Sequence, residues 1–160
     1  MKNNEKYNSI PDTEDHIQEV KNHLGEFVAV IFSRWLDHDR SKLKSPEVEI
    51  FDEYTPKLRD CIYGSDEYKN YLKEMKVALD HHYSVNRHHP EYHKNGIQDM
   101  NLADIVEMLC DWSSACKRHK TGNIFESIEI NQKRFGYSDE LKKILINTVP
   151  LIEQNNVKVD

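Results

Sequence analysis

The chain has 160 residues, a formal net charge of −6 and nine histidines. This length suits one domain, and 38% hydrophobic with 31% charged residues is the composition of a globular protein. The acidic balance argues against binding to a nucleic-acid backbone, which needs clustered Lys and Arg. No apolar run approaches the roughly 18 to 20 residues of a membrane span, and the N-terminal residues lack the apolar core of a signal peptide. We therefore expect a cytoplasmic protein with neither nucleic-acid nor membrane partners.

The first third of the chain shows one long helical pattern and two shorter ones. Residues 1–12 are polar and contain a proline, so we expect a flexible N-terminal arm there. From Thr13, apolar residues follow the three-four spacing of an amphipathic helix. Two helix-start signals, each a Ser or Thr followed by Pro, stand near residues 45 and 55. They favour two short helices over residues 46–63.

The remainder of the chain also has helical periodicity. Ser65 opens a long helix that continues to His82, and a polar connection follows it. Asn101 is the expected cap of the next helix, and a later helix ends at Gly136 before the last one starts at Ser138. Strand alternation is not convincing anywhere. The sequence thus predicts an all-α fold of five to seven helices, which form a single domain over residues 13–160.

Two adjacent residues of metal-ligand type, His38 and Asp39, stand in the motif LDHDRSKL, where Lys42 follows them. A His-Asp pair by itself is a weak signal, because it often arises by chance. The pair gains weight from the stretch DHHYSVNRHHPEYH, which holds five of the nine histidines. A chain that leaves a helix and turns back can present His82 and His89 towards one point, and imidazole is the commonest nitrogen ligand of transition metals.

Three acidic residues, Asp104, Glu107 and Asp111, follow at spacings of three and four in NLADIVEMLCDW. On a helix they share one face, where like charges repel unless a cation or a set of donors lies among them. A solvated acidic stripe is the alternative interpretation. The histidines tip the balance towards a metal site, but the spacing alone does not decide whether Asp104 or Asp111 completes it.

Several of these motifs together resemble a known family. HDRSKL…SPE from residue 38, HH…N.HHPEY from residue 81 and VEMLCDW from residue 106 are similar to motifs of DUF5662, a family of uncharacterised bacterial and phage proteins, over roughly residues 13–150. More distantly, HIQEV at 16–20, the His-Asp pair and LAD at 102–104 resemble the HD-domain superfamily of metal-dependent phosphohydrolases. That superfamily is all-α and takes its ligands in the order His, His-Asp, sometimes two further His, and Asp.

The resemblance implies an HD-like helical domain with six metal ligands. They would be His16, His38, Asp39, His82, one of His88 or His89, and a carboxylate of the acidic helix. We favour His89 and Asp111 for the two open choices. An unbroken helix over 13–36 would place the Cα atoms of His16 and His38 about 33 Å apart. A shared metal therefore requires the chain to reverse between them, and Gly25 is the candidate for a break.

A reaction follows from such a site. A divalent metal ion lowers the pKa of a bound water and polarises a phosphoryl oxygen, while Lys42, Arg40 or Arg87 could neutralise a substrate phosphate. Our candidate catalytic residues are Lys42 and Glu107, the latter as a proton-handling or ligand-orienting carboxylate. We expect a phosphohydrolase that acts on a nucleotide or another small phosphate ester, with one or two ions of Mn, Fe, Zn, Ni or Mg.

Two other functions fit the same residues. Some HD-like proteins with four histidines and two carboxylates hold two irons and use oxygen to cleave C–C or C–P bonds. Alternatively, a non-catalytic helical module could bind a structural metal or a partner, and a closed site would favour it. Helical surfaces such as Phe125, Ile128 and Phe135 could serve a homodimer as readily as a core.

Overall fold

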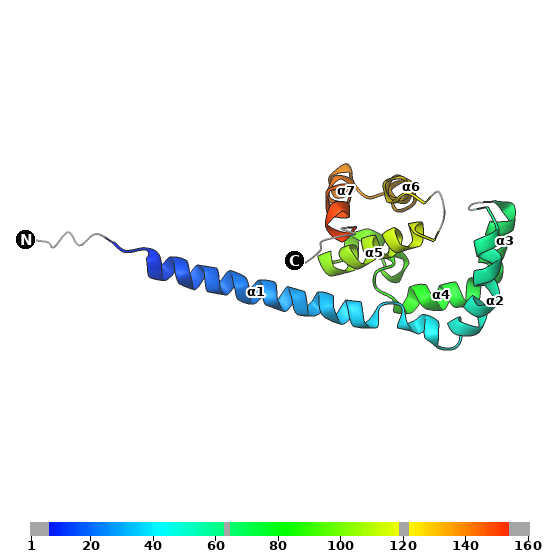
Figure 1. Ribbon diagram of the computed structural model, residues 1–160, viewed down its shortest axis with the longest axis horizontal. Coiled ribbons are helices and arrows are strands. Elements are labelled where there is room, and N and C mark those ends of the chain that lie inside the picture. The colour runs from blue at the N-terminus through cyan, green and yellow to red at the C-terminus, as the bar shows by residue number, and fades with distance from the viewer. Residues whose placement is uncertain (1–6, 63–64, 119–121, 154–160) are drawn as a thin grey trace, which may run out of the picture. The chain divides into compact units, whose positions relative to one another are not determined.

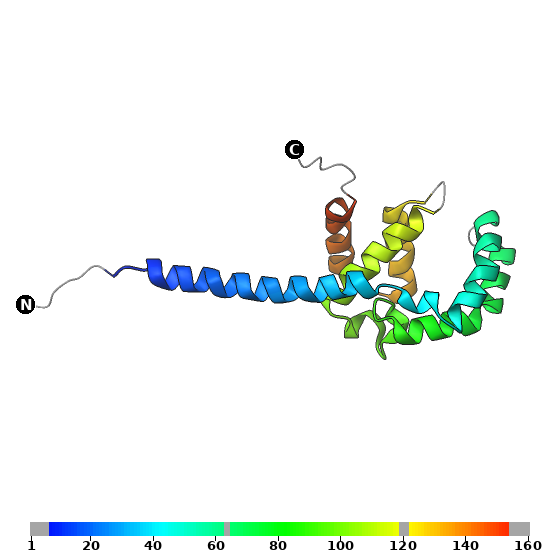
Figure 2. The ribbon, with the colours of Figure 1, turned by 60° about the horizontal axis from the view of Figure 1, so that its bottom comes forward.

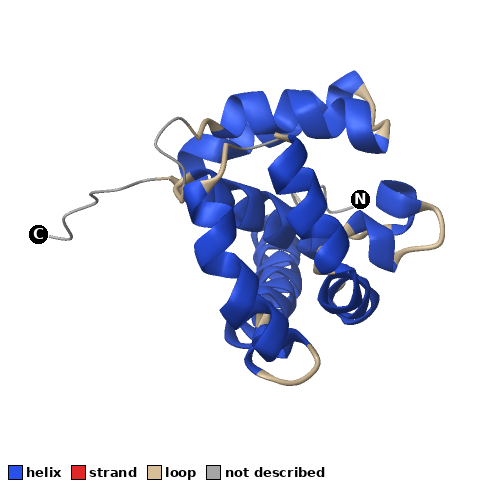
Figure 3. Cartoon of the chain, turned by 90° about the vertical axis from the view of Figure 1, so that its right-hand side faces the viewer, coloured by secondary structure: helices blue, strands red, loops and turns tan. Residues whose placement is uncertain are grey.

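The protein is described by a computed structural model that covers residues 7–62, 65–118 and 122–153, and among these residues it contains helices and loops but no strand (Figure 3). The predicted all-α fold is confirmed. The α-helices of these ranges are α1 (Ile10–Asp37), α2 (Glu47–Asp60), α3 (Asp66–Glu74), α4 (Lys76–Val85), α5 (Leu102–Cys116), α6 (Ile124–Phe135) and α7 (Asp139–Ile152). Short 3₁₀ helices, η1 (Arg40–Leu43), η2 (Pro90–Tyr92) and η3 (Gly96–Asp99), lie in the connections. None of the helices formed by these residues is long and apolar enough to cross a membrane.

The chain divides into two compact units, residues 1–37 and 38–160. In the described part of the first unit, α1 is a single helix of 28 residues (Figures 1 and 2). It starts at Ile10, earlier than predicted, and continues through Gly25 without the break that we considered there. The single domain over 13–160 stays a prediction, as does the flexibility of the arm, whose residues 10–12 already belong to α1.

Two predicted boundaries in the second unit are wrong. The two short helices expected over 46–63 are one helix, α2, which contains Pro56 in its interior. Proline there removes one backbone hydrogen bond, but α2 packs against α4 and η1, and this packing holds the helix together. Conversely, the helix expected from Ser65 to His82 is split at Met75, where ψ is 0° and the side chain is 1% exposed. Apolar periodicity continues across this break and so cannot reveal it.

The caps of the later helices are as predicted. The Asn101 side chain accepts a hydrogen bond from the backbone N–H of Asp104, and the Ser138 side chain accepts one from Leu141. Gly136 ends α6 with φ of 67°, in the left-handed region that glycine enters without steric cost. These local signals set where α5 begins, and α5 carries two of the site residues described below.

A hydrophobic core lies among α5, α6 and α7. Its buried residues are Ile105, Met108, Leu109, Ile124, Ile128, Tyr137, Leu145 and Val149. The Tyr137 hydroxyl donates a hydrogen bond of 2.6 Å to the backbone carbonyl of Ile128. Ile128 therefore belongs to the core, whereas Phe125 is 46% exposed. This core anchors one face of α5 and leaves its acidic residues Glu107 and Asp111 to face the histidines.

Candidate metal centre

A first group of potential ligands consists of Asp39, His82, His88 and His89, whose ligand atoms all lie within 4.8 Å of one another. Asp39 Oδ1 is 3.4 Å from His82 Nε2 and 3.4 Å from His88 Nε2. His82 Nε2 lies 2.8 Å from His89 Nε2. The side chains of His82 and His88 are 2% exposed. Three imidazole nitrogens and one carboxylate oxygen around one point form a donor set that suits a divalent transition metal.

A second group shares Asp39 and His88 with the first and adds His38 and Asp111. His38 Nε2 lies 3.5 Å from Asp39 Oδ2 and 3.8 Å from Asp111 Oδ1. The two oxygens of Asp39 thus have different neighbours, because Oδ1 lies near His82 and His88 and Oδ2 lies near His38. A carboxylate with this orientation is suited to bridge two ions, as in two-metal hydrolytic sites.

The backbone at Asp39 is unusual. Its φ of 56° and ψ of 16° lie in the left-handed region, which Asp enters more often than most residues with a side chain. This backbone conformation costs a residue with a side chain on the order of 1 kcal/mol, and it persists only where the surrounding structure stabilises it. Here the Asp39 carbonyl accepts a 2.9 Å hydrogen bond from Lys42 N, and Lys42 Nζ contacts Asp39 Oδ2 at 2.6 Å. These two contacts fix the Asp39 carboxylate between the two groups.

The paired histidines reach the site through a reversal of the chain after α4. His82 lies in the last turn of α4, and that helix ends at Asn86, which has extended backbone. His89 also has extended backbone and directly precedes Pro90, which starts η2. The reversal returns His88 and His89 to the C-terminal end of α4, where their rings pack at a centroid distance of 4.1 Å.

Glu107 of α5 contacts the Nδ1 atoms of His38 and His88. Its Oε1 lies 2.9 Å from His38 Nδ1 and 3.2 Å from His88 Nδ1. An ionised carboxylate only accepts hydrogen bonds, so each Nδ1 must carry the proton. Nε2 of both rings is then left with a free lone pair that points at the potential metal positions. Carboxylates behind metal-bound histidines orient them in this way.

Glu47, the first residue of α2, does the same for the histidines of α4. Its side chain is 0% exposed, and its two oxygens lie 3.0 Å from His82 Nδ1 and 2.7 Å from His81 Nδ1. The amide of Asn86 also approaches His82 Nδ1, but its two protons have acceptors in Ser41 Oγ at 2.8 Å and the His82 carbonyl at 2.9 Å. The His82 Nδ1 proton is therefore donated to Glu47, and Nε2 faces Asp39.

The electrostatics favour ligands in the deprotonated forms that a metal ion needs. Burial, helped by the neighbouring rings of His88 and His82, lowers the pKa of His89 to about 2, so this imidazole is neutral. Burial alone would raise the pKa of Glu107, but its hydrogen bonds with His38 and His88 lower it to about 2. Burial would likewise raise the pKa of Asp39, and the Lys42 ammonium keeps it below its ordinary value.

His38 differs from His82 and His89, whose pKa values burial lowers. Its hydrogen bond with Glu107 raises the pKa of the imidazole above 6.5, against the lowering effect of burial. Its side chain is 34% exposed, whereas those of His82 and His88 are 2% exposed. A metal ion at the second group would therefore compete with a proton on His38.

Two buried polar atoms lack a hydrogen-bond partner among the described residues, Asp39 Oδ1 and His88 Nε2. They lie 3.4 Å apart. Since the proton of His88 is on Nδ1, both atoms are acceptors and face each other. Two desolvated acceptors in contact are unfavourable unless a donor or a cation lies between them. This pair is the most direct structural sign of a cation site.

Most of the chain is covered by a family model. A model described as a family of unknown function, DUF5662, matches residues 5–153. The chain belongs to this family. Neither a curated protein nor a solved structure matches the DUF5662 chain.

The two candidate carboxylates of α5 have different surroundings in this DUF5662 chain. Asp104 is 0% exposed, forms a capping box with Asn101 and is paired with Arg87 at 3.0 Å. Asp111 lies two turns further along α5 and belongs to the second group. Of the choices that the spacing left open, the structure thus brings Asp111 to His38. Arg87, considered for substrate phosphate, is already paired with Asp104.

His16 lies on α1, in the other unit, and neither group includes it. Because α1 has no break at Gly25, His16 and Asp37 are 21 residues apart on one helix, which is about 32 Å along its axis. His16 as a ligand stays a prediction.

The sequence did not lead us to Glu47, and it gave His88 only as an alternative ligand. Glu47 was not considered, because an acidic residue in the first turn of a helix is common and needs no further role. His88 was treated as an alternative to His89, but it belongs to both groups. Only a tertiary contact reveals either role.

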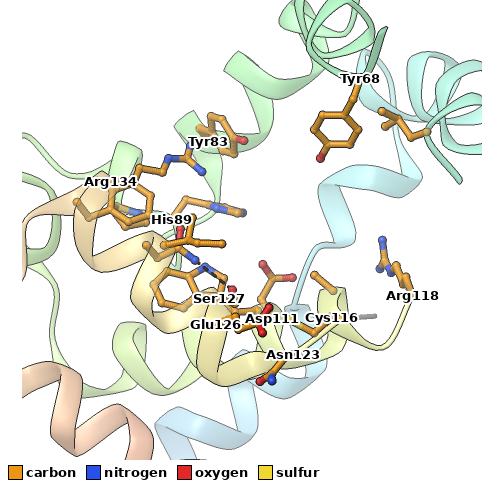
Figure 4. Close-up of a pocket in the computed structure, with 18 of the residues that line it drawn as sticks. Tyr68, Tyr83, His89, Asp111, Cys116, Arg118, Asn123, Glu126, Ser127 and Arg134 are labelled. Atoms are coloured by element: carbon orange, nitrogen blue, oxygen red, sulfur yellow. Dashed lines mark hydrogen bonds between the residues drawn. The ribbon is translucent and has the colours of Figure 1, made fainter. Parts of the chain in front are cut away.

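A cavity of about 920 Å³ adjoins both groups (Figure 4). His89 of the first group and Asp111 of the second line it, together with Trp112 of α5 and residues of α2, α4 and α6. The site is therefore accessible to a ligand of small-molecule size.

Proposed function

We propose that the DUF5662 chain is a metal-dependent hydrolase of phosphate esters that holds one or two divalent ions. The observation that carries the proposal is the pair of four-residue groups that share Asp39 and His88, with two buried acceptors facing each other at their centre. The distant resemblance to HD-domain phosphohydrolases agrees with this donor set, in which a His-Asp pair joins further histidines and a later Asp.

Six side chains would hold the ions. They are His38, Asp39, His82, His88, His89 and Asp111. When bound, a divalent ion supplies Lewis acidity and a water of lowered pKa, and two adjacent ions suit phosphoryl transfer because the entering and leaving oxygens both carry negative charge.

The residues around the ligands have roles that follow from their contacts. Lys42 Nζ lies at Asp39 Oδ2, on the side of the second group, and could donate to a phosphate oxygen there. Glu107 is engaged by two imidazole N–H groups, which supports an orienting role over direct proton transfer. Asp111 is 21% exposed and lines the cavity, so it is the carboxylate best placed to contact a substrate.

Access to solvent supports an enzyme over a structural metal site. Structural zinc sites are closed by four protein ligands, whereas catalytic sites keep a position for water or substrate. Here His89 and Asp111 contribute to both the ligand groups and the wall of a large cavity.

One observation favours a second candidate, a di-iron oxygenase. The two groups together contain four imidazoles and two carboxylates, the ligand count of the HD-like proteins that activate oxygen. The identity of the metal decides between the two, since hydrolysis proceeds with redox-inactive Zn or Mg and oxygen chemistry does not.

The first experiment is to measure metal content by plasma mass spectrometry on untagged protein. Hydrolysis of p-nitrophenyl phosphate and bis(p-nitrophenyl) phosphate is then assayed with Mn, Fe, Zn, Ni and Mg, alongside oxygen uptake with Fe. We expect one or two equivalents of metal and hydrolysis of at least one ester, both lost in His88→Ala.

The matched control is His23→Ala, because His23 is exposed on α1 and belongs to neither group. It should keep the metal and the activity. Full hydrolysis in Asp39→Asn, or no metal after reconstitution with each ion, would contradict the proposal. Oxygen uptake without hydrolysis would favour the second candidate.

A further inference from the structure

The cavity beside the two candidate metal groups carries positive charge that is not paired within the part of the chain that the structure describes. Three arginines line it, Arg59, Arg118 and Arg134. Arg134 Nη2 donates a 2.6 Å hydrogen bond to Glu91 Oε1, so its charge is compensated. The guanidinium groups of Arg59 and Arg118 have no hydrogen-bond or ion-pair partner within the described ranges of the chain. Two free guanidinium groups in one cavity are notable in a chain of net charge −6.

The acidic residues of the cavity do not balance these two arginines. Glu91 is paired with Arg134, and Asp111 belongs to the second metal group. Of the acids in the cavity lining, this leaves Glu126, in the first turn of α6. Two guanidinium groups thus face one uncommitted carboxylate, and the cavity keeps a positive balance away from the metal groups.

The position of the arginines is as important as their charge. Arg59 belongs to α2 and Arg118 follows α5, so they come from two different elements of the cavity wall. Figure 4 shows Arg118 on the opposite side of the cavity from His89 and Arg134, with Asp111 between them. A ligand that contacts both His89 and Arg118 must therefore extend across the cavity.

The size and lining of the cavity agree with an extended ligand. A volume of about 920 Å³ lies at the upper end for small-molecule sites, roughly 300 to 1,000 Å³, and far exceeds the needs of one inorganic phosphate. Phe51, Trp112 and Ile130 give part of the cavity wall an apolar character. An apolar wall suits the carbon skeleton of an ester better than a ligand that is charged along its whole length.

We propose that the substrate carries two anionic groups, one phosphate at the metal groups and a second anion held by Arg59 and Arg118. This inference rests on the proposed function for the first phosphate. Guanidinium groups bind phosphate and carboxylate oxygens through paired N–H donors, and arginine stays charged at any physiological pH. Arg59 and Arg118 are thus residues that determine specificity and take no part in the reaction itself.

The test compares two ligands that differ in one anion. Hexyl phosphate and hexane-1,6-diyl bisphosphate share a carbon chain, and bisphosphates of shorter and longer chains cover the span of the cavity. Affinities are measured by calorimetry on the full-length protein, with and without Mn²⁺. The variants are Arg59→Gln with Arg118→Gln, and the control is Lys143→Gln, which removes an exposed charge on α7 outside the cavity.

We expect at least one bisphosphate to bind about tenfold more tightly than the monophosphate, as one or two charge-assisted hydrogen bonds provide. The double arginine variant should lose this advantage, and Lys143→Gln should keep it. Equal affinities for the two ligands, no binding of either, or an advantage that survives the loss of both arginines would overturn the inference.

The two proposals fail in different ways. Binding of hexyl phosphate that depends on Mn²⁺ and on Asp39 supports the metal site, whatever the arginines do. A bisphosphate advantage that depends on the arginines but not on Mn²⁺ supports the second anion site alone.

Discussion

Asp104 is a fully buried carboxylate of the second unit and Asp39 a largely buried one with a side chain 16% exposed, but their partners differ. Both oxygens of Asp104 have donors, from the Arg87 guanidinium and the backbone N–H of Asn101. Asp39 has a donor for Oδ2 in Lys42, whereas its Oδ1 faces the acceptor nitrogen of His88.

The difference separates a carboxylate whose two oxygens both have donors from one whose Oδ1 has none among the described residues. A buried charge is tolerated when the protein supplies all of its hydrogen bonds, as it does at Asp104. At Asp39, Oδ1 faces His88 Nε2, and the described residues supply no donor for either atom. A cation would satisfy these atoms, so the same physical requirement that is met within the fold at Asp104 would be met by a bound ion at Asp39.

The largest expected effect concerns metal and stability. Because an ion that binds only the folded state stabilises it by mass action, we expect about 4 kcal/mol at a free metal concentration of about 1,000 times Kd. Asp39→Asn should abolish this gain, since Asp39 is common to both groups. Denaturant unfolding with Zn²⁺, Mn²⁺ or a chelator measures it. Equal stabilisation of Asp39→Asn and the wild type would remove the distinction between the two carboxylates.

The complementary change is Asp104→Ala. It removes the partner of Arg87 and half of the α5 capping box, so we expect a loss of about 2 to 4 kcal/mol in the free energy of unfolding. Metal affinity, measured on the folded protein, should stay near the wild-type value. Asp99→Ala is the control, because Asp99 also bonds a neighbouring residue, Asn95, but is exposed. It should cost less than about 1 kcal/mol.

Glu107 and Glu47, which contact Nδ1 atoms of the candidate ligand histidines, give a third prediction. Substitutions of such carboxylates weaken metal binding by about 10- to 100-fold. Glu107 bonds a histidine common to both groups, so Glu107→Gln should weaken every bound equivalent. Glu47 bonds His82, which belongs to the first group only, so Glu47→Gln should weaken one. Calorimetric titration resolves the two cases, and identical effects of both variants would contradict the two-group arrangement.

The smallest effect comes from a neutral buried pair, Tyr137 and the Ile128 carbonyl. Tyr137→Phe should cost about 1 kcal/mol at neutral pH because it removes this hydrogen bond. Burial raises the pKa of Tyr137 to about 12, from 10.0. Above pH 10 the unfolded tyrosine ionises first, so the wild type loses stability by up to about 1.4 kcal/mol per pH unit until pH 12.

The phenylalanine variant lacks this ionisation, so the two stability curves should converge above pH 10 and then cross. Denaturant midpoints between pH 7 and pH 11 measure the difference. A constant gap across that range would mean that Tyr137 titrates alike in both states.

Local signals in the sequence account for much of the fold. Apolar periodicity indicates helical segments, and the caps Asn101 and Ser138 with the stop at Gly136 mark the ends of three of them. Each of these signals acts within a few residues, through backbone hydrogen bonds that the neighbouring side chain completes or releases. The boundaries at Pro56 and Met75 were wrong because packing between helices decided them.

For the candidate site too, some features follow from the sequence and others follow only from the tertiary structure. The sequence by itself determined the supply of ligands: a His-Asp pair, histidines on both sides of a chain reversal, and acidic residues on one face of α5. The tertiary structure alone decided which of them meet, because His38, the stretch from His82 to His89, and Asp111 are separated from one another by tens of residues. It also decided that Asp104 is paired with Arg87 and that Glu47 orients His82. Donor chemistry belongs to single residues, but a coordination geometry depends on distances that only the packing of helices sets.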